Sequence, residues 1–303
     1  TCRLLQETHR GGLLIALQDA SANVSANGNV KVDTVFNPTL WAQGSTNSSV
    51  AANNSYFNTY SNQASFEVSS LVGAVQLGLQ HRDNISSAGL STATGSLKNH
   101  DYGAIHPGIV HATAFSGDIT AYKMLLAPSL NGQLQLLAAH NVTGVTSTST
   151  GGQLPTASVI ISDADNVNQF TINQPFVGNA ADGTLSEFIA TFKTGKAAVP
   201  VHKGDSSQSV IIAREGNVDF KGRPSSSASD NVYGLKSSMP VYISAGQDVT
   251  MHASIQHNNQ GDISIVKAGN DFVMELPNAD AEFVIHGPGD LLIEASRNIN
   301  LGK

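Results

Sequence analysis

The chain has 303 residues with 16 basic and 23 acidic side chains, so 13% of it is charged and the net charge is −7. Soluble domains carry about 25% charged residues, and here Ser, Thr, Asn, Gln and 28 Gly take the place of the missing charge. The acidic balance excludes the basic face of a nucleic-acid binder, and the single Cys2 excludes an internal disulfide framework. No apolar run approaches the roughly 18 residues of a membrane helix, so no membrane insertion is expected.

Taken in chain order, short Val- and Ile-rich runs alternate with Ser-, Asn- and Gly-rich connections, which favours strands over helices. We expect one β-solenoid unit over residues 1–303: N-terminal rungs in 1–44, rungs with long insertions in 45–199 and regular C-terminal rungs in 200–303. We also expect the chain to be a fragment of a longer protein.

The long connections and one helix are predicted from local composition. Polar excursions are expected at Ala42–Gln63, Thr146–Gln153 and Gly222–Ser238. One short helix is expected at Asp182–Lys196, because its apolar residues fall on one face and Gly195 ends it.

The last hundred residues repeat a short unit. Each copy is an alternating strand, then Ala, two small or polar residues, Asp or Asn, and a second strand. The predicted corner residues of these rungs are Ala245, Asp248, Ala268, Asp271, Ala295 and Asn298. A rung of this length cannot bury its own inner face, whereas rungs stacked about 4.8 Å apart bury a continuous column.

These repeats predict an all-β fold, a parallel β-helix or β-solenoid. Asn and Asp suit the bends between strands, and stacked Asn side chains are expected to bond to one another along the stack. A β-sandwich with strands every eight to twelve residues remains the alternative.

Several segments resemble a known family. The final rung, Gly287–Gly302, is similar to a rung of the filamentous-haemagglutinin-like exoproteins of bacterial two-partner secretion. Pro200–Asp205 with the strand that follows, and also Asn37–Thr39 and Ser55–Tyr60, are similar to segments of the large C-terminal β-helix region in one branch of that family. The second Asn-Pro motif of the family's secretion domain is missing.

The resemblance implies a right-handed parallel β-helix that an outer-membrane two-partner secretion transporter exports from the parent protein. It also implies a secreted or bacterial cell-surface location and a structural or adhesive role in cell adhesion and biofilm. The expected partner is a host or bacterial surface glycan or protein. The open ends of a solenoid also predict end-to-end self-association into filaments or matrix.

Candidate sites are few. Trp41, Tyr56, Phe57 and Tyr60 form a candidate contact patch for a sugar or a protein, or alternatively a plug that covers the solenoid. We expect no catalytic residues, no metal site and no cofactor, and therefore no enzyme.

The rival interpretation is a β-helix that binds or degrades polysaccharide as a lyase or hydrolase. Such chemistry needs paired carboxylates on one face, for which Asp163 and Asp165 are the candidates.

Overall fold

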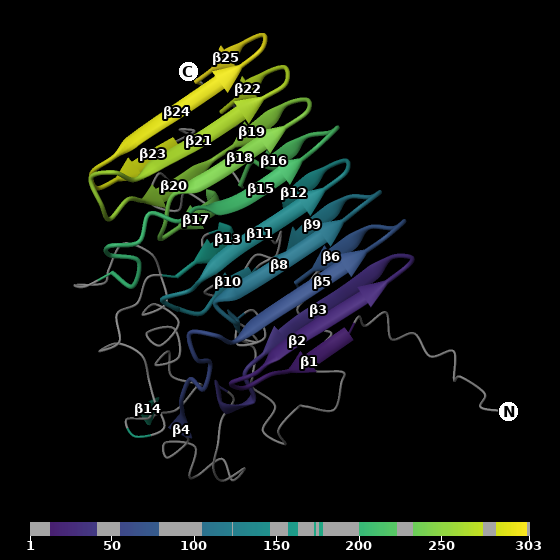
Figure 1. Ribbon diagram of the computed structural model, residues 1–303, viewed down its shortest axis with the longest axis vertical. Coiled ribbons are helices and arrows are strands. Elements are labelled where there is room, and N and C mark those ends of the chain that lie inside the picture. The colour runs from purple at the N-terminus through teal and green to yellow at the C-terminus, as the bar shows by residue number, and fades with distance from the viewer. Residues whose placement is uncertain are drawn as a thin grey trace, which may run out of the picture.

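The computed structural model describes residues 13–40, 55–78, 105–122, 124–145, 157–162, 173, 176–177, 200–222, 233–274 and 283–301. Three parallel sheets contain nearly all of the strands in these ranges, and each sheet draws strands from the whole length of the chain (Figure 1). The predicted all-β parallel solenoid is therefore confirmed, and parallel pairing throughout the three sheets excludes the β-sandwich alternative.

Sheet A has nine strands and begins with β1, one strand before sheet B begins with β2. Its strands are β1 (Leu13–Ala16), β3 (Val30–Phe36), β6 (Val75–Leu77), β9 (Ile119–Tyr122), β12 (Val142–Val145), β16 (Val218–Phe220), β19 (Val249–Met251), β22 (Phe272–Val273) and β25 (Ile299–Asn300).

Sheet B has eight strands, and they are the longest and most regular. They are β2 (Ser21–Ala26), β5 (Ser65–Ser70), β8 (Ile109–Ala114), β11 (Gln133–Ala138), β15 (Ser209–Ala213), β18 (Val241–Ala245), β21 (Ile263–Ala268) and β24 (Asp290–Ala295).

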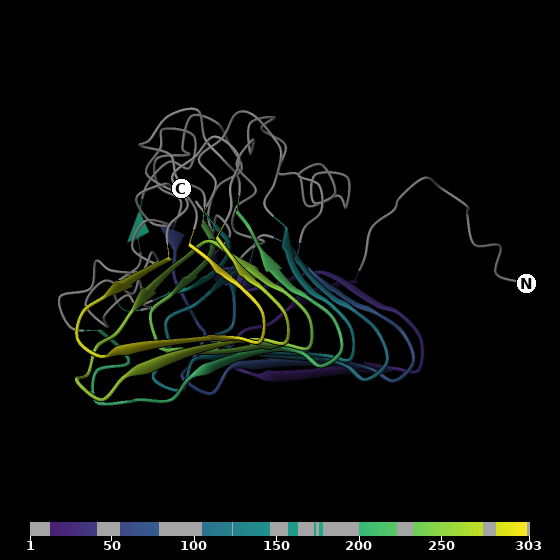
Figure 2. The same ribbon diagram turned by 90° about the horizontal axis from the view of Figure 1, so that it is seen from above.

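Sheet C has six strands and closes part of the third side of the coil. They are β7 (Ile105–His106), β10 (Met124–Leu126), β13 (Ala157–Ile161), β17 (Tyr233–Ser237), β20 (Ala253–Gln256) and β23 (Phe283–His286). A complete coil thus runs from sheet B through a corner to sheet A and then to sheet C, as the view along the stack shows (Figure 2). The sequence repeat predicted two strands per rung and missed this third one.

Outside the stack lie one antiparallel pair and one turn. The pair joins β4 (Ser55–Tyr56) to β14 (Phe176–Val177), and a single 3-10 turn spans Pro38–Leu40. The prediction of a loop over Gly222–Ser238 is wrong in its second half, because β17 there pairs with β13 and β20. The helix predicted at Asp182–Lys196 lies outside the described residues, and no helix in the described ranges is long and apolar enough to cross a membrane.

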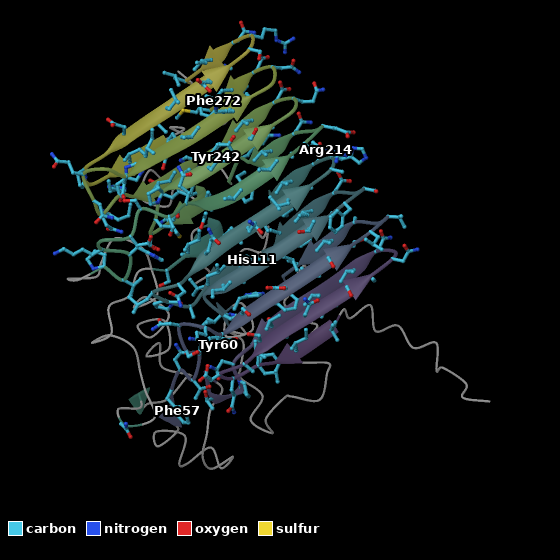
Figure 3. The ribbon with its side chains drawn as sticks, in the orientation of Figure 1. Phe57, Tyr60, His111, Arg214, Tyr242 and Phe272 are labelled. Carbon is cyan, nitrogen blue, oxygen red and sulfur yellow. The ribbon has the colours of Figure 1, made fainter. Side chains whose placement is uncertain are left out.

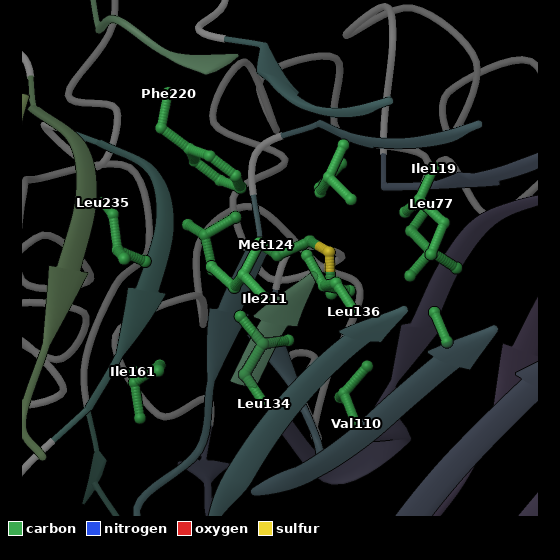
Figure 4. Packing of buried hydrophobic residues seen from close by; sticks show 14 of the residues in the cluster. Leu77, Val110, Ile119, Met124, Leu134, Leu136, Ile161, Ile211, Phe220 and Leu235 are labelled. Carbon is green, nitrogen blue, oxygen red and sulfur yellow. The ribbon is translucent and has the colours of Figure 1, made fainter. Parts of the chain in front are cut away.

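Inward-facing side chains of the three sheets form one continuous core (Figure 4). The largest fully buried ones include Phe66, Phe220 and Phe272. Gly144 makes room for one of them, because a Cβ at this position would lie 2.3 Å from Cδ1 of Phe220. Half-buried and buried residues alternate along inner strands of sheet B such as β8 and β11, which follows from the two-residue period of a β-strand.

Candidate contact surface

The outer face of sheet B is a flat array of three columns, each built from residues in register on neighbouring strands. The middle column runs along Asn23, Glu67, His111, Gln135, Val210, Tyr242, Ile265 and Leu292. Its flanking columns run along Ser21, Ser65, Ile109 and Gln133, and along Ser25, Ser69, Thr113, Leu137, Ile212, Ser244, Lys267 and Glu294. His111 and Tyr242 are labelled on this sheet in Figure 3.

The first half of this face, on β2, β5 and β8, is mostly polar and hydroxyl-rich. Ser65 donates to Ser21 with its hydroxyl at 2.8 Å, and Asn23 Nδ2 donates to Glu67 Oε2 at 3.1 Å, so neighbouring rungs bond to each other on the outside of the sheet. Hydroxyl and amide side chains stack in this way without the repulsion that a column of like charges causes.

The second half of the face, from β11 to β24, carries most of the apolar side chains of the face, together with Gln133, Gln135, Ser244, Lys267 and Glu294. We call Leu137, Val210, Ile212, Tyr242, Ile263, Ile265 and Leu292 the apolar patch. Ile263 is 38% exposed and Leu292 is 39% exposed, and the other members are half-buried. From strand spacing and residue rise the patch has a footprint of about 300–400 Å², which is within the size range of the largest apolar patch on an ordinary monomer, a patch that is often functional.

Three charged side chains lie beside the apolar patch. Lys267 Nζ lies 2.9 Å from Glu294 Oε2 on the adjacent strand, and this carboxylate raises the pKa of the lysine. The third is Asp290, an exposed residue in register with Ile263. The patch therefore offers contact area and a phenolic hydroxyl, with one acidic group at its edge.

The six predicted corner residues all lie at the turn from sheet B to sheet A. Ala245, Ala268 and Ala295 end β18, β21 and β24. Asp248, Asp271 and Asn298 directly precede β19, β22 and β25. Close backbone approach makes this corner narrow: a Cβ on Gly269 would lie 2.0 Å from the carbonyl oxygen of Gly246.

A hydrogen-bond ladder runs along this corner. At each step the backbone N–H of one corner residue donates to the side-chain oxygen of the equivalent residue on the preceding coil. The donor and acceptor pairs are Asn141 and Asp118, Asn217 and Asn141, Asp248 and Asn217, Asp271 and Asp248, and Asn298 and Asp271, at 2.8–3.0 Å. The expected bonding between Asn side chains is thus replaced, for the most part, by side-chain-to-backbone bonds. The ladder starts at Asn29, whose Oδ1 accepts the backbone N–H of Ala74. Because Ala74 has no side-chain oxygen, it cannot accept the next bond, and the ladder is interrupted there.

The ladder also fixes charges near its end. The guanidinium of Arg297, which donates from Nε to Asp271 Oδ1 at 2.8 Å, lowers the pKa of Asp271 to about 2, and Asn298 adds to the effect. Asp271 is therefore ionised at any physiological pH and acts as a fixed acceptor for two neighbours.

The structure describes the side chains of two of the four residues in the candidate aromatic patch, Phe57 and Tyr60. Tyr60 is buried, and its hydroxyl donates to the carbonyl of Ile105 at 3.2 Å. Burial raises the pKa of its phenol well above the ordinary value. Phe57 is half-buried (Figure 3), Tyr56 lies in β4, and Trp41 lies outside the described residues. The position of Tyr60 fits the plug interpretation rather than a surface site.

The segment that carries Tyr60 is held by a buried amide network. Asn37 Nδ2 donates to Asn58 Oδ1 at 3.2 Å, and Thr39 and Thr59 donate their hydroxyls to Asn37 Oδ1. Asn37–Thr39, noted for family resemblance, thus anchors an excursion in this structure.

Two further kinds of site would support chemistry beyond contact, a metal site and a pair of carboxylates for glycan cleavage. The described part of the chain contains no group of three or more His, Cys, Asp or Glu arranged to hold a metal. Asp163 and Asp165, the candidates for glycan cleavage, lie outside the described residues. The absence of an enzymatic activity therefore stays a prediction.

Comparison of the chain with protein-family models, with curated protein sequences and with solved structures found no match. The resemblance to filamentous-haemagglutinin-like exoproteins thus rests on the sequence motifs alone.

Sequence reasoning missed the outer face of sheet B. A signal was present: Val210–Ile212 and Ile263–Val266 are largely unbroken apolar runs, whereas a sheet with one solvated face alternates apolar and polar residues. Such runs indicate apolar residues on both faces of the strand.

Proposed function

We propose that this chain is a structural and adhesive rod of a secreted or cell-surface protein, which attaches a bacterial cell to a surface through the outer face of sheet B. The observation that carries the proposal is the apolar patch, a flat and charge-poor surface on a rigid stack of rungs. Export by a two-partner secretion transporter and a role in biofilm belong to the same proposal and rest on the family resemblance.

The dimensions of the patch favour a surface over a tight protein complex. Stable protein–protein interfaces bury about 800 Å² on each partner, roughly twice the area of the apolar patch. A contact of this size is weak when single and gains strength when many copies act together on one surface.

The chemistry of the face favours a glycan. Sugar rings present C–H faces and hydroxyl edges, and the apolar patch lies directly beside a column of amides and hydroxyls. Tyr242 and Ile265 offer area for the ring faces, and Gln135 and Thr113 offer donors and acceptors for the hydroxyls. The low charge of the face favours neutral over acidic polysaccharides.

A pull-down on insoluble cellulose and chitin tests this function. The double variant Tyr242→Ser, Ile265→Ser is expected to reduce the retained fraction at least about tenfold, since two apolar contacts are lost. The matched control is Val273→Ser, which removes an outward, half-buried apolar residue from sheet A and is expected to leave binding unchanged.

Equal loss in the double variant and the control would overturn the assignment of the face. Binding to immobilised host protein but to neither polysaccharide would overturn the glycan partner. New reducing ends during incubation would show the rival polysaccharide-degrading function and contradict a purely adhesive role.

A further inference from the structure

A strap precedes β15 and reaches across the stack to a coil two rungs further along. The strap is residues 200–208, and it bonds to the corner 258–262 that leads into β21. Backbone N–H of Gly204 donates to Asn259 Oδ1 at 2.7 Å, and the hydroxyl of Ser206 donates to Asp262 Oδ1 at 2.9 Å. β18 lies between the two coils in sheet B, so the strap bypasses one corner.

The strap is held by polar contacts outside the three sheets. Gln208 Nε2 donates to the carbonyl of Ile263 at 2.7 Å, and Asn259 Nδ2 donates to the carbonyl of Asp205 at 2.9 Å. None of these bonds belongs to a β-ladder. Val201 of the strap is buried, but it is not part of the continuous core. A segment held mainly outside the core opens locally at a lower free energy than the core strands, so the strap can detach while the stack remains folded.

Two buried histidines lie at this joint. His202, on the strap, is 1% exposed, and within the described residues neither of its ring nitrogens makes a hydrogen bond. Its Nδ1 lies 3.5 Å from Asp205 Oδ2. His257, which directly precedes the corner, is fully buried; its Nε2 lies 2.8 Å from the hydroxyl of Ser264, and its backbone N–H donates to the carbonyl of His286 on the last coil. Burial lowers the pKa of both imidazoles, although nearby carboxylates partly oppose this.

The charged groups that face the histidines are already engaged. Asp205, on the strap, accepts the backbone N–H and the hydroxyl of Ser207. Asp262, on the corner, accepts the backbone N–H groups of Asn258 and Asn259 at 2.7 and 2.9 Å. Burial by itself raises the pKa of each carboxyl, but these donors outweigh it and both pKa values are lowered.

The remaining groups are at the edges of the joint. Asp290, on the last coil, acts on His257 from the far side, and the strap's own Lys203 is exposed to solvent. No further described group thus stands ready to compensate a proton added to either buried ring.

We propose that the strap is an acid-released latch, which closes over the corner when His202 is neutral and opens when it is protonated. Opening places the imidazole of His202 in water, where the charged form is solvated, and frees the corner amides. The latch is independent of the proposed attachment function, because it contacts the solenoid and needs no partner.

The direction of the pH effect follows from the lowered pKa values. Histidine in an open strap has its ordinary pKa near 6.5, and in the closed strap a lower one. The closed state therefore has its full stability above about pH 6.5 and loses stability as the pH falls below that value, until the closed-state pKa is reached.

Hydrogen–deuterium exchange of the 303-residue chain at pH 7.5 and 5.0, corrected for intrinsic exchange, tests the latch. Protection of residues 200–208 is expected to fall about tenfold for each unit by which the histidine pKa in the closed strap lies below its value in the open strap. The strands β18 and β21 are expected to keep their protection. His202→Gln is expected to shrink this pH dependence. The matched control is His140→Gln, which removes an exposed histidine at a distant corner and is expected to leave it unchanged.

A second variant keeps the test decisive if His202→Gln does not fold. Asn259→Ala removes the strap's amide anchor without removing a titratable group, and its strap is expected to be poorly protected at both pH values. Strap protection in the native chain that is equal at pH 7.5 and 5.0 would overturn the proposal. Loss of protection in β18 and β21 together with the strap would also overturn it, because that result describes global unfolding.

Discussion

The two faces of sheet B obey different rules. On the inner face, every strand from β2 to β24 places apolar or small residues in the same columns, and the position before the corner is Ala in seven of the eight strands (Ala26, Ala114, Ala138, Ala213, Ala245, Ala268 and Ala295) and Ser70 in the other. On the outer face, the same strands pass from Ser, Asn and Glu to Val, Tyr and Leu. Close packing restricts the choice of residue along the whole inner face, whereas contact with solvent leaves the choice of residue on the outer face open. A change of residue type along the outer face therefore indicates a functional surface.

The largest expected difference between the faces is in stability. Phe220→Ala empties a fully buried site and is expected to lower the free energy of unfolding by about 3–5 kcal/mol. Tyr242→Ala, on the outer face, is expected to cost about 1 kcal/mol or less. Denaturant unfolding of both variants measures the difference, and equal losses would contradict the assignment of Tyr242 to the outside.

A gain of function sharpens the comparison between the two halves of the outer face. His111→Ile places an apolar side chain in the middle column on β8, on the other side of Gln135 from the apolar patch. It is expected to increase retention on polysaccharide by about threefold to fivefold. Thr120→Ile, on the outer side of sheet A, serves as control for added apolar area. A similar increase in the control would show non-specific adhesion.

The corner ladder offers a matched pair of variants. Asp118→Ala removes the acceptor for the backbone N–H of Asn141 and is expected to cost about 1 kcal/mol. Ala74→Asn fills the natural interruption and is expected to stabilise by a similar or smaller amount. Thermal unfolding of both variants measures how much the ladder stabilises the fold. The corner between β5 and β6 has four residues, one more than the corner between β2 and β3. A destabilising Ala74→Asn would show that an Asn in this longer corner cannot form the missing hydrogen bond.

The smallest effect is the titration of Asp271. Its folded-state pKa of about 2 lies below the ordinary value of 3.8, so its contribution is fully present above pH 3.8 and is lost as the pH falls toward 2. Because the pair with Arg297 is exposed, the change is expected to be slight. Arg297→Gln should shrink it, as chemical denaturation between pH 5 and 2 would show, and an unchanged profile would contradict the role of the guanidinium.

End-to-end association remains a prediction, and the structure adds a constraint to it. The inward-facing Leu291, Ile299 and Leu301 of the last coil are exposed. At the opposite end, sheet A begins with β1, one strand earlier than sheet B begins with β2. The described strands of the two ends therefore do not match rung for rung, and direct stacking leaves a gap in sheet B.

The sequence by itself determined the solenoid, because its cause is local and repeated. Ala, small or polar residues and Asp or Asn recur at every described corner between sheets B and A except Ser70–Ala74. These residue types are the ones that let a backbone turn and bond along a stack. Low charge follows from the same cause, since rungs about 4.8 Å apart bring equivalent side chains together.

Only the tertiary structure decided which coils become neighbours across the long insertions. It therefore also decided which side chains lie next to each other on the surface. Leu137 and Ile212 are adjacent because β11 pairs with β15 across more than seventy residues of chain, a distance at which sequence periodicity carries no register. The strap shows the same limit: Ser206 and Asp262 bond to each other because two distant segments of the chain lie together in the stack, and no local sequence pattern predicts that contact.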